Sequence, residues 1–290
     1  MRGDCMNTYN DIYITTRRRL RAAGIEAHDL EARLIVAHAA GKSREELIRC
    51  SRLYVPDSAI VSTVDAMVTR RVEGEPVAYI VGEWEFLGLP MTVNRDVMIP
   101  RIDTELLAKE TIRLIRRRNG QARVLDLCAG SGCIGLSVSA NVPSCRIVLA
   151  DNSERALAVC RMNMQKNNLS RNITAIELDA LETHPALLGK FDAIVSNPPY
   201  IPTGDLDGLD ASVRDYEPRE ALDGGPDGLY FYRGIVTNWT SLLKAGGFFA
   251  LECGVGQSKD VRGILMDAGI RDIVTHIDTL GIERVLIGTV

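Results

Sequence analysis

The sequence lacks any apolar stretch long enough to cross a membrane. A spanning helix needs roughly 18 or more consecutive apolar residues, and no run in the 290-residue chain approaches that length. The first ten residues, MRGDCMNTYN, are polar and contain no apolar core of a signal peptide. We therefore expect a cytoplasmic protein that does not associate with membranes.

The cysteines and histidines lack the spacing of disulfide frameworks and metal sites. The cysteines number seven, which is odd, and no Cys-x-x-Cys motif occurs. They are Cys5, Cys50, Cys128, Cys133, Cys145, Cys160 and Cys253. The four histidines are scattered, at His28, His38, His184 and His276. This pattern predicts free thiols in a reducing compartment, structural histidines and no bound metal.

The chain also lacks an excess of positive charge. Its formal net charge is −4, which argues against a protein that follows nucleic acid along a basic face. Two arginine clusters, Arg17–Arg21 and Arg116–Arg118, fall on predicted helices. We interpret each cluster as a solvated helix face or as the C-terminal turn of a helix.

The N-terminal part is rich in helix signals. Residues 1–75 are predicted to form a small helical domain, in which Ser43 and Glu46 make a capping box. Residues 76–100 read as a linker that contains a β-hairpin with a Gly-Leu-Pro turn. Thr104 is then expected to cap a helix that closes at Asn119-Gly120.

From residue 122 strands and helices alternate, which predicts an α/β domain over residues 101–290. The expected helices lie at 132–140, 153–168, 228–244 and 256–268. The expected strands lie at 123–127, 146–151, 173–179, 191–196, 247–252, 273–277 and 283–288. Only five residues join the last two strands, too few for a parallel crossover, so this pair must be antiparallel. A seven-stranded, mostly parallel, Rossmann-like sheet with one reversed strand is the outline of S-adenosylmethionine-dependent methyltransferases, an analogy that carries no function by itself.

A glycine-rich loop follows the first strand of this domain. Gly130, Gly132 and Gly135 satisfy G-x-G-x-x-G, and Asp151 ends the next strand 21 residues after Gly130. Such a loop lets the backbone approach a nucleotide, and the acid can accept from both ribose hydroxyls. These residues favour an NAD enzyme and a methyltransferase equally.

Two further acids favour a methyl donor. Asp126 lies on the first strand and Asp179 ends the third, both toward the edge marked by Asp151. Three carboxylates suit a ligand with a cationic head, two ribose hydroxyls and an amino group. They suit a pyrophosphate poorly, because like charges repel.

The tetrapeptide Asn-Pro-Pro-Tyr follows the fourth strand. Asn197 offers a side-chain oxygen, and Pro198 and Pro199 offer carbonyls but no N–H donors. Two fixed φ angles make the corner rigid. Its acceptors suit a group with two N–H bonds on one nitrogen. Acceptors that hold both N–H bonds could direct the nitrogen lone pair at a methyl group. Tyr200 would pack on the planar group that carries the nitrogen.

The sequence resembles bacterial release-factor glutamine methyltransferases, the protein-(glutamine-N5) methyltransferases of the HemK type. The matching segments are 74–89, 99–107, 126–132, 196–201, 216–229 and 281–288. The resemblance implies methyl transfer from S-adenosyl-L-methionine to the glutamine of the Gly-Gly-Gln motif in class-1 peptide-chain release factors, with S-adenosyl-L-homocysteine as product. It also implies that the N-terminal domain helps to dock the release factor.

The same resemblance implies roles for individual residues. Asn197 and the Pro198 carbonyl would hold the glutamine amide, with Pro199 and Tyr200 beside it. The cofactor would lie against the acids and the loop, at Asp126, Cys128, Ala129, Gly130, Ser131, Gly132, Asp151, Asp179, Ala180 and Asn197. Three positions depart from the family pattern. Cys128 replaces a glycine and would be strained at positive φ, Ile102 replaces a proline, and Ala180 stands where relatives often carry an aromatic residue.

Other functions compete with this interpretation. An adenine-amino methyltransferase acting on nucleic acid shares the Asn-Pro-Pro-Tyr chemistry but would need a base-flipping pocket and a basic channel. A cofactor-binding scaffold without transfer and an NAD dehydrogenase are further alternatives. We expect a monomer that acts on a protein rather than on nucleic acid. Arg101, Glu105, Glu217 and Arg219 could shape the substrate pocket, clamp the 202–226 loop or form plain ion pairs.

Overall fold

The computed structural model describes residues 7–118, 121–183 and 186–290. These residues form two compact units. The first unit runs up to Gly82 and includes Ala211–Tyr216, and the second comprises Glu83–Asp210 and Glu217–Val290. Cys5, His184 and the predicted helix end at Asn119-Gly120 lie outside the described residues.

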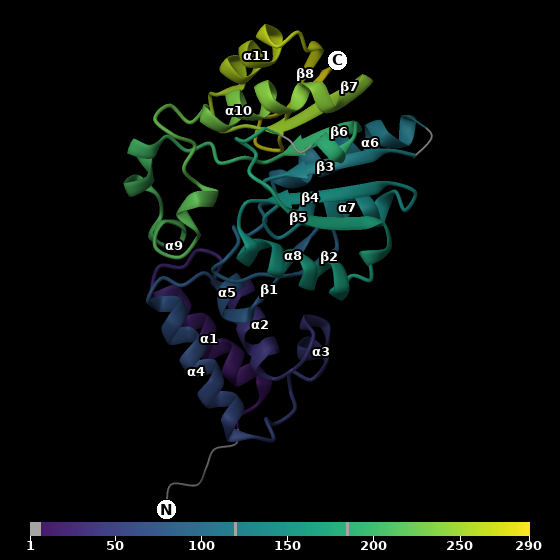
Figure 1. Ribbon diagram of the computed structural model, residues 1–290. Helices are drawn as coiled ribbons and strands as arrows, with labels where there is room; N and C mark the ends of the chain where they lie inside the picture. The colour runs from purple at the N-terminus through teal and green to yellow at the C-terminus, as the bar shows by residue number, and fades with distance from the viewer. Residues whose placement is uncertain (1–6, 119–120, 184–185) are drawn as a thin grey trace, which may run out of the picture. The chain divides into compact units, whose positions relative to one another are not determined.

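The first unit is helical (Figure 1). Its helices are α1 (Tyr9–Ala22), α2 (His28–Ala39), α3 (Arg44–Arg49), α4 (Ser58–Val72), α5 (Val77–Val81) and the short α9 (Ala211–Arg214). The predicted capping box at Ser43 is confirmed, because Ser43 Oγ accepts from the Glu46 N–H at 3.1 Å and Glu46 accepts from the Ser43 N–H at 2.8 Å. Apolar side chains at helical spacing, including Leu20, Ile35 and Val68, are fully buried between the helices.

The predicted hairpin forms at the start of the second unit, but its turn differs from the expectation. Strands β1 (Glu83–Phe86) and β2 (Leu89–Thr92) are antiparallel. The turn consists of Leu87 and Gly88, which both have positive φ, at 49° and 78°. Pro90 therefore belongs to β2, opposite Glu85, and not to the turn. A two-residue hairpin turn with this geometry matches the twist of the flanking strands.

The second unit contains the predicted seven-stranded sheet. Its strands are β3 (Arg123–Leu127), β4 (Arg146–Asp151), β5 (Ile173–Glu177), β6 (Phe191–Ser196), β7 (Leu243–Glu252), β8 (Arg271–Ile277) and β9 (Glu283–Thr289). The strand order is β5-β4-β3-β6-β7-β9-β8. Pairs from β5 to β7 are parallel, and β9 runs antiparallel to both neighbours, which confirms the reversed strand.

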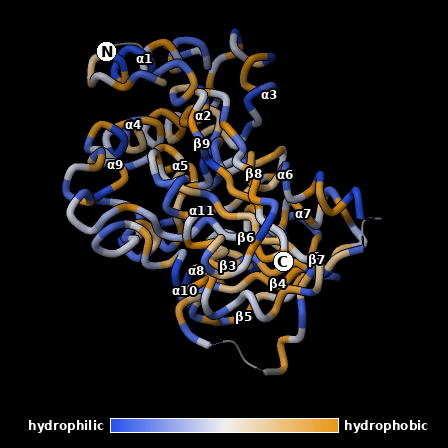
Figure 2. Tube along the Cα trace, turned by 90° about the horizontal axis from the view of Figure 1, so that it is seen from above, coloured by the Kyte–Doolittle hydropathy of each residue, from blue (hydrophilic) through white to orange (hydrophobic). Residues whose placement is uncertain are grey.

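Helices α6 (Thr104–Arg117), α7 (Cys133–Asn141), α8 (Glu154–Lys166), α10 (Tyr230–Trp239) and α11 (Ser258–Asp267) cover the sheet (Figure 1). Trp239 and Tyr232 on α10 and Leu265 on α11 pack with strand residues such as Leu125 in one core cluster. The central strands are mostly orange in Figure 2, as strands covered on both faces should be.

The start of α6 and the end of α10 differ from the sequence-based expectation for a structural reason. The N-cap of α6 is Asp103, which makes no side-chain capping bond, and Thr104 is its buried first residue. The predicted 228–244 helix is shorter, because α10 stops at Trp239 and a 3₁₀ turn leads into β7. Leu243 already pairs with Phe191 of β6, so sheet pairing overrides the helical pattern there.

The composition-based expectations concern cysteines, metals and membranes. Six cysteines lie in the described residues and all are free thiols. Within the same residues, no cluster of three or more potential metal ligands occurs. None of the helices in the described ranges is both long and apolar enough for a membrane span.

Candidate active site

A cavity of about 700 Å³ opens at the carboxyl ends of the central parallel strands, within the second unit. Strand order reverses between β3 and β6, and ligands of open α/β sheets bind at such a switch point. The wall is contributed by segments that follow β3, β4, β5 and β6, with additions from residues 95–104 and 218–221 and from Phe231.

The loop after β3 forms one wall of the cavity. Cys128, Ala129, Gly130 and Ser131 line it. The φ angles of Cys128, Gly130 and Gly132 are positive, at 59°, 54° and 80°. Cys128 therefore occupies the left-handed conformation that normally favours glycine. The sequence analysis expected strain at Cys128 in that case. Gly132 does not line the cavity, because it faces α8, where an added Cβ would lie 2.8 Å from Cys160 Sγ.

Asp151, at the end of β4, holds this loop and lines the cavity. Its Oδ2 accepts the Gly130 N–H at 2.8 Å, and its Oδ1 accepts the Ser153 N–H at 3.0 Å. Burial raises the pKa of Asp151, while the two N–H donors oppose the rise. A carboxylate has about four acceptor sites, so each oxygen retains acceptor capacity for a ligand.

The position of Asp126 differs from the sequence-based expectation that its carboxylate faces the cofactor. Its side chain is fully buried, its Oδ2 accepts the Gly135 N–H at 2.8 Å, and it is not among the residues that line the cavity. Its Oδ1 has no hydrogen-bond partner among the described residues. Burial raises the pKa of Asp126 to about 7. Leu125 and Leu127 belong to the core cluster, so strand alternation turns Asp126 to the opposite face, toward α7.

Asp179 and Ala180 line the cavity as expected. Asp179 lies two residues beyond β5, which ends at Glu177 rather than at the predicted 179, and its Oδ1 accepts the Leu181 N–H at 2.8 Å. The Ala180 carbonyl accepts the Trp239 indole N–H at 2.8 Å, which fixes this segment against α10. Phe231 of α10 supplies an aromatic side chain to the cavity wall.

Asn197 comes directly after β6 and lines the cavity together with Pro199. Its Nδ2 donates to Thr104 Oγ1 at 3.2 Å. Its Oδ1 is buried and has no hydrogen-bond partner among the described residues. The corner thus presents one unused carbonyl acceptor, in agreement with the acceptor-rich character inferred from the sequence.

Pro198 and Tyr200 do not line the cavity. Tyr200 packs against the core cluster and lies close to Gly254, where an added Cβ would be 3.0 Å from Tyr200 Cδ2. Its carbonyl accepts from Gln257 Nε2 at 2.8 Å, and burial raises the pKa of its hydroxyl to about 12. Its partly buried ring packs against the core cluster, so the packing of Tyr200 on the substrate amide stays a prediction.

Arg101 and Glu217 form an ion pair across the segments that flank the cavity. The Glu217 side chain is almost fully buried, and it also accepts the Ile99 N–H at 3.3 Å. Burial raises the pKa of Glu217, and the Arg101 guanidinium opposes that rise. The pair fixes the start of the segment that carries Pro218, Glu220 and Ala221 into the wall.

Sequence reasoning missed several wall residues. Thr104 was expected to cap a helix, and Phe231 and Ser153 had no assigned role, yet all three line the cavity. Thr104 lies in the 99–107 segment that carries the family resemblance, which is the signal that could have found it. Phe231 is brought in by a helix distant in sequence, so no local pattern marks it.

Two family models match the chain. Residues 11–82 match the PrmC N-terminal domain, and residues 103–208 match the Methyltransferase small domain. A methyltransferase from Pyrococcus furiosus is similar in fold, with a TM-score of 0.52 over 76% of this chain and 96% of that chain at 17% identity. The sheet with its reversed β9, the cavity at the switch point and these matches define a methyltransferase.

Relatives that match almost the whole chain show which family of methyltransferases it belongs to. The chain is 38% identical to the release factor glutamine methyltransferase of Geobacter sulfurreducens, over 95% of this chain and 94% of that protein. It is 37% identical to the release factor glutamine methyltransferase of Caulobacter vibrioides, with the same coverage. The chain therefore belongs to the family of release factor glutamine methyltransferases.

Proposed function

We propose that this enzyme transfers a methyl group from S-adenosyl-L-methionine to the side-chain amide nitrogen of the glutamine in the Gly-Gly-Gln motif of class-1 peptide-chain release factors. The observation that carries the proposal is the buried, unpartnered Oδ1 of Asn197 on the cavity wall. A buried acceptor without a donor costs about 1–3 kcal/mol, so it fits a ligand that brings an N–H. The names of the relatives, release factor glutamine methyltransferases, support glutamine as the source of that N–H.

The cavity residues fit the proposed cofactor by charge. Among the described residues, its wall includes five carboxylates, Asp96, Asp151, Glu154, Asp179 and Glu220, and two guanidinium groups, Arg95 and Arg155. This excess of negative charge suits a ligand with a sulfonium and an ammonium group and opposes a pyrophosphate, which argues against an NAD dehydrogenase.

Individual residues would hold separate parts of the cofactor. We assign the ribose hydroxyls to Asp151, the amino acid end to the Cys128–Ser131 loop, and the adenine to Asp179, Ala180 and Phe231. Phe231 would take the role of the aromatic side chain that Ala180 lacks. The bound cofactor would supply an electrophilic methyl group on sulfur, and the product would be S-adenosyl-L-homocysteine. Asp126 and Gly132 support the loop from behind and are not in the proposed contact set.

The amide would be held by the corner after β6. Asn197 Oδ1, on the cavity wall, would accept one N–H of the glutamine amide. The family resemblance assigns the other N–H to the carbonyl of Pro198, which directly follows Asn197 but is not among the residues that line the cavity, with Pro199 beside them. An amide nitrogen is a weak nucleophile because its lone pair is delocalised. Holding both N–H bonds orients the nitrogen, and near-attack alignment can supply roughly 7–11 kcal/mol in favourable cases. Tyr200 contributes by keeping the corner rigid.

The adenine amino group of a nucleic acid is the second candidate acceptor, since it offers the same –NH2 geometry to Asn197. The net charge of −4 and the carboxylate-rich cavity disfavour a polyanionic substrate. We therefore propose a protein as the substrate. We further propose that the enzyme acts as a monomer and in the cytoplasm, where release factors act.

A methyl-transfer assay separates these acceptors. The enzyme and labelled S-adenosyl-L-methionine are offered a class-1 release factor, the same factor with its Gly-Gly-Gln glutamine changed to alanine, and DNA. We expect label on the first substrate alone. Label on DNA would favour the adenine reaction, and label on the alanine variant would refute the proposed site.

A further inference from the structure

Four large apolar side chains are more than two thirds exposed among the described residues. They are Leu187, Ile102, Leu280 and Val255, at 99%, 79%, 76% and 69%. A single exposed apolar residue is normal on a protein surface, whereas a group of them marks an interaction site. The contacts of Arg284 bring together the segments that carry the last three.

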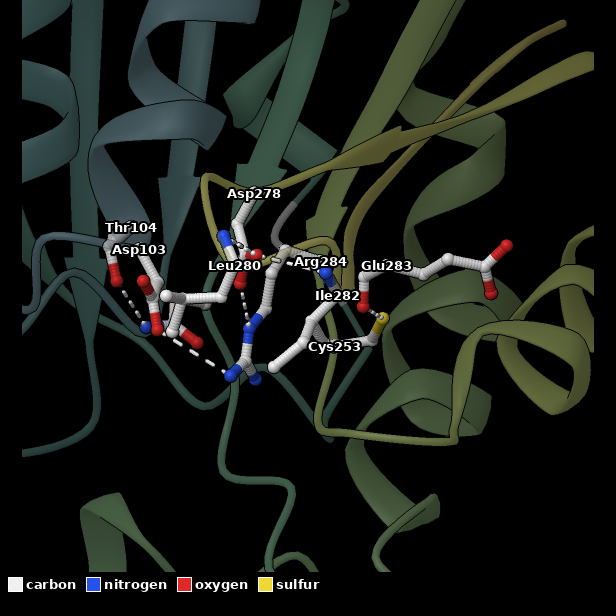
Figure 3. A network of polar contacts seen from close by, with 9 residues as sticks. Asp103, Thr104, Cys253, Asp278, Leu280, Ile282, Glu283 and Arg284 are labelled. Carbon is white, nitrogen blue, oxygen red and sulfur yellow. Dashed lines mark hydrogen bonds and ion pairs between the residues drawn. The ribbon is translucent and has the colours of Figure 1, made fainter.

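The side chain of Arg284, on β9, joins two of these segments (Figure 3). Its guanidinium lies 3.5 Å from the carboxylate of Asp103, the residue after Ile102, and it donates from Nε to Asp278 at 3.0 Å. Asp278 in turn accepts the Leu280 N–H at 2.8 Å. The start of α6 and the turn between β8 and β9 are therefore neighbours, and each presents one aliphatic side chain to solvent.

The loop after β7 is joined to them by the backbone of Arg284. The Arg284 carbonyl accepts the Cys253 N–H at 2.8 Å, and Val255 follows two residues later. Gly254, between them, lies against the ring of Tyr200, because an added Cβ there would be 3.0 Å from Tyr200 Cδ2. The loop that carries Val255 therefore borders the corner that follows β6.

Ile102 lies at the edge of the cavity. Pro100 and Thr104, two residues before and after it, both line the wall, whereas Ile102 does not. Thr104 also accepts a hydrogen bond from Asn197 Nδ2, at 3.2 Å. The exposed aliphatic group thus adjoins the Asn197 corner on both the α6 side and the β7 side. We call this group the apolar rim, and it consists of Ile102, Val255 and Leu280.

The charged groups that link these segments are paired with one another. The Arg284 side chain is only 12% exposed and lies between the carboxylates of Asp103 and Asp278. Arg101, next to Ile102 in sequence, pairs with a buried glutamate. The rim therefore offers aliphatic surface to a partner, and its complement is an apolar segment rather than a charged one.

We propose that the apolar rim binds apolar side chains of the release factor that adjoin its Gly-Gly-Gln motif. This inference rests on the proposed function and adds the surface that holds the substrate protein. The two glycines of the motif have no side chains, so the motif itself buries little apolar area. The residues beside it cross the rim when the glutamine amide lies at Asn197, and they supply the missing area. The contacts of Arg284 hold the rim in place before binding, which lowers the entropy lost on association.

Serine variants of the rim test the proposal. Ile102→Ser, Val255→Ser and Leu280→Ser remove aliphatic surface at exposed positions. We expect each to raise the Kd of the release factor for enzyme loaded with S-adenosyl-L-homocysteine about tenfold, the lower end for burial of one aliphatic side chain. The triple variant should raise it at least about 100-fold. Leu280→Met keeps an apolar side chain and should stay within about twofold of wild type. Isothermal titration calorimetry measures each Kd.

Leu187→Ser is the matched control. Leu187 is the most exposed of the four apolar residues. It lies at the opposite edge of the sheet, because the carbonyl of the next residue, Leu188, accepts from the guanidinium of Arg123 at the start of β3. Its Kd for the release factor should stay within about twofold of wild type. In the rim variants, KM for the release factor should rise while kcat and the Kd of S-adenosyl-L-homocysteine stay within about twofold, because the rim does not line the cavity.

Two results would overturn the proposal while leaving the proposed function intact. One is a triple variant that is labelled and binds the release factor as Leu187→Ser does. The other is a wild-type enzyme that dimerises in sedimentation velocity while the rim variants stay monomeric, because a second copy of the chain would then cover the rim. A release factor that wild-type enzyme neither binds nor labels would refute the proposed function and the rim together.

Discussion

Asp151→Ala tests the placement of the cofactor most sharply. The change removes the acceptor for the Gly130 and Ser153 N–H groups, which lie 2.8 and 3.0 Å from the carboxylate oxygens. It also removes the proposed acceptor for both ribose hydroxyls. A hydrogen bond to a charged group contributes about 1.5–3 kcal/mol, so two such bonds are worth about 3–6 kcal/mol before solvent replaces part of them.

Taking the lower end of that range, we expect the Kd for S-adenosyl-L-homocysteine to rise about 100-fold, which corresponds to about 3 kcal/mol. Isothermal titration calorimetry measures this directly. The matched control is Asp192→Ala, because Asp192 on β6 also accepts a backbone N–H, from Arg123 at 2.7 Å, but does not line the cavity.

The control variant should lose stability without losing affinity for the product. An Asp151→Ala variant that binds S-adenosyl-L-homocysteine within threefold of wild type, while remaining folded, would refute the assignment of Asp151 to the ribose. Equal losses of affinity in both variants would instead identify a general effect of losing a partly buried carboxylate that accepts a backbone N–H.

Three further predictions concern the loop and its support. Gly135→Ala should destabilise the fold by about 1–3 kcal/mol, because the new Cβ would lie 2.3 Å from Leu149 Cδ2, and a denaturation midpoint close to wild type would contradict this. The pKa of Asp126 is raised by burial from 3.8 to about 7, so the folded state retains a proton that the unfolded state releases, and stability should fall as pH rises between those values. Asp126→Asn keeps an acceptor for Gly135 and should flatten this slope in melting temperature against pH; an unchanged slope would exclude Asp126 as its source. Finally, Cys128→Gly should be more stable than Cys128→Ala by about 1 kcal/mol in urea unfolding, because only the alanine keeps a Cβ at a φ of 59°; equal stabilities would mean that the position is unstrained.

Local sequence patterns predicted the site residues that lie at the end of a strand or directly after it. Asp151 and Asn197 end or follow β4 and β6, and parallel strands bring such positions to one edge. Asp126 lies off the cavity wall, on the face toward α7, and the other residues of β3 between Val124 and Leu127 are apolar on both faces. The sequence of β3 therefore does not distinguish the side of the pleat that faces the cavity from the side that faces α7.

Residues that act across the fold had no local signal. Thr104 meets Asn197 only because α6 packs beside β6, and this contact cannot be inferred from spacing along the chain. Tyr200 follows Asn197 closely in sequence, yet its ring packs against the core cluster, because the chain turns between them. Tertiary packing, rather than propensity, decides these positions.

The central claim is that Asn197 presents an acceptor to a glutamine amide beside the bound methyl donor. The most direct measurement is single-turnover methyl transfer from preloaded S-adenosyl-L-methionine to a class-1 release factor, with the methyl group located by tandem mass spectrometry, for wild type and Asn197→Ala. We predict that wild type modifies the Gly-Gly-Gln glutamine and that the variant binds the cofactor but transfers roughly 10²–10³-fold more slowly, as for loss of one preorganised hydrogen-bonding group. An Asn197→Ala variant with near wild-type transfer, or a methyl group on any other residue, would contradict the account.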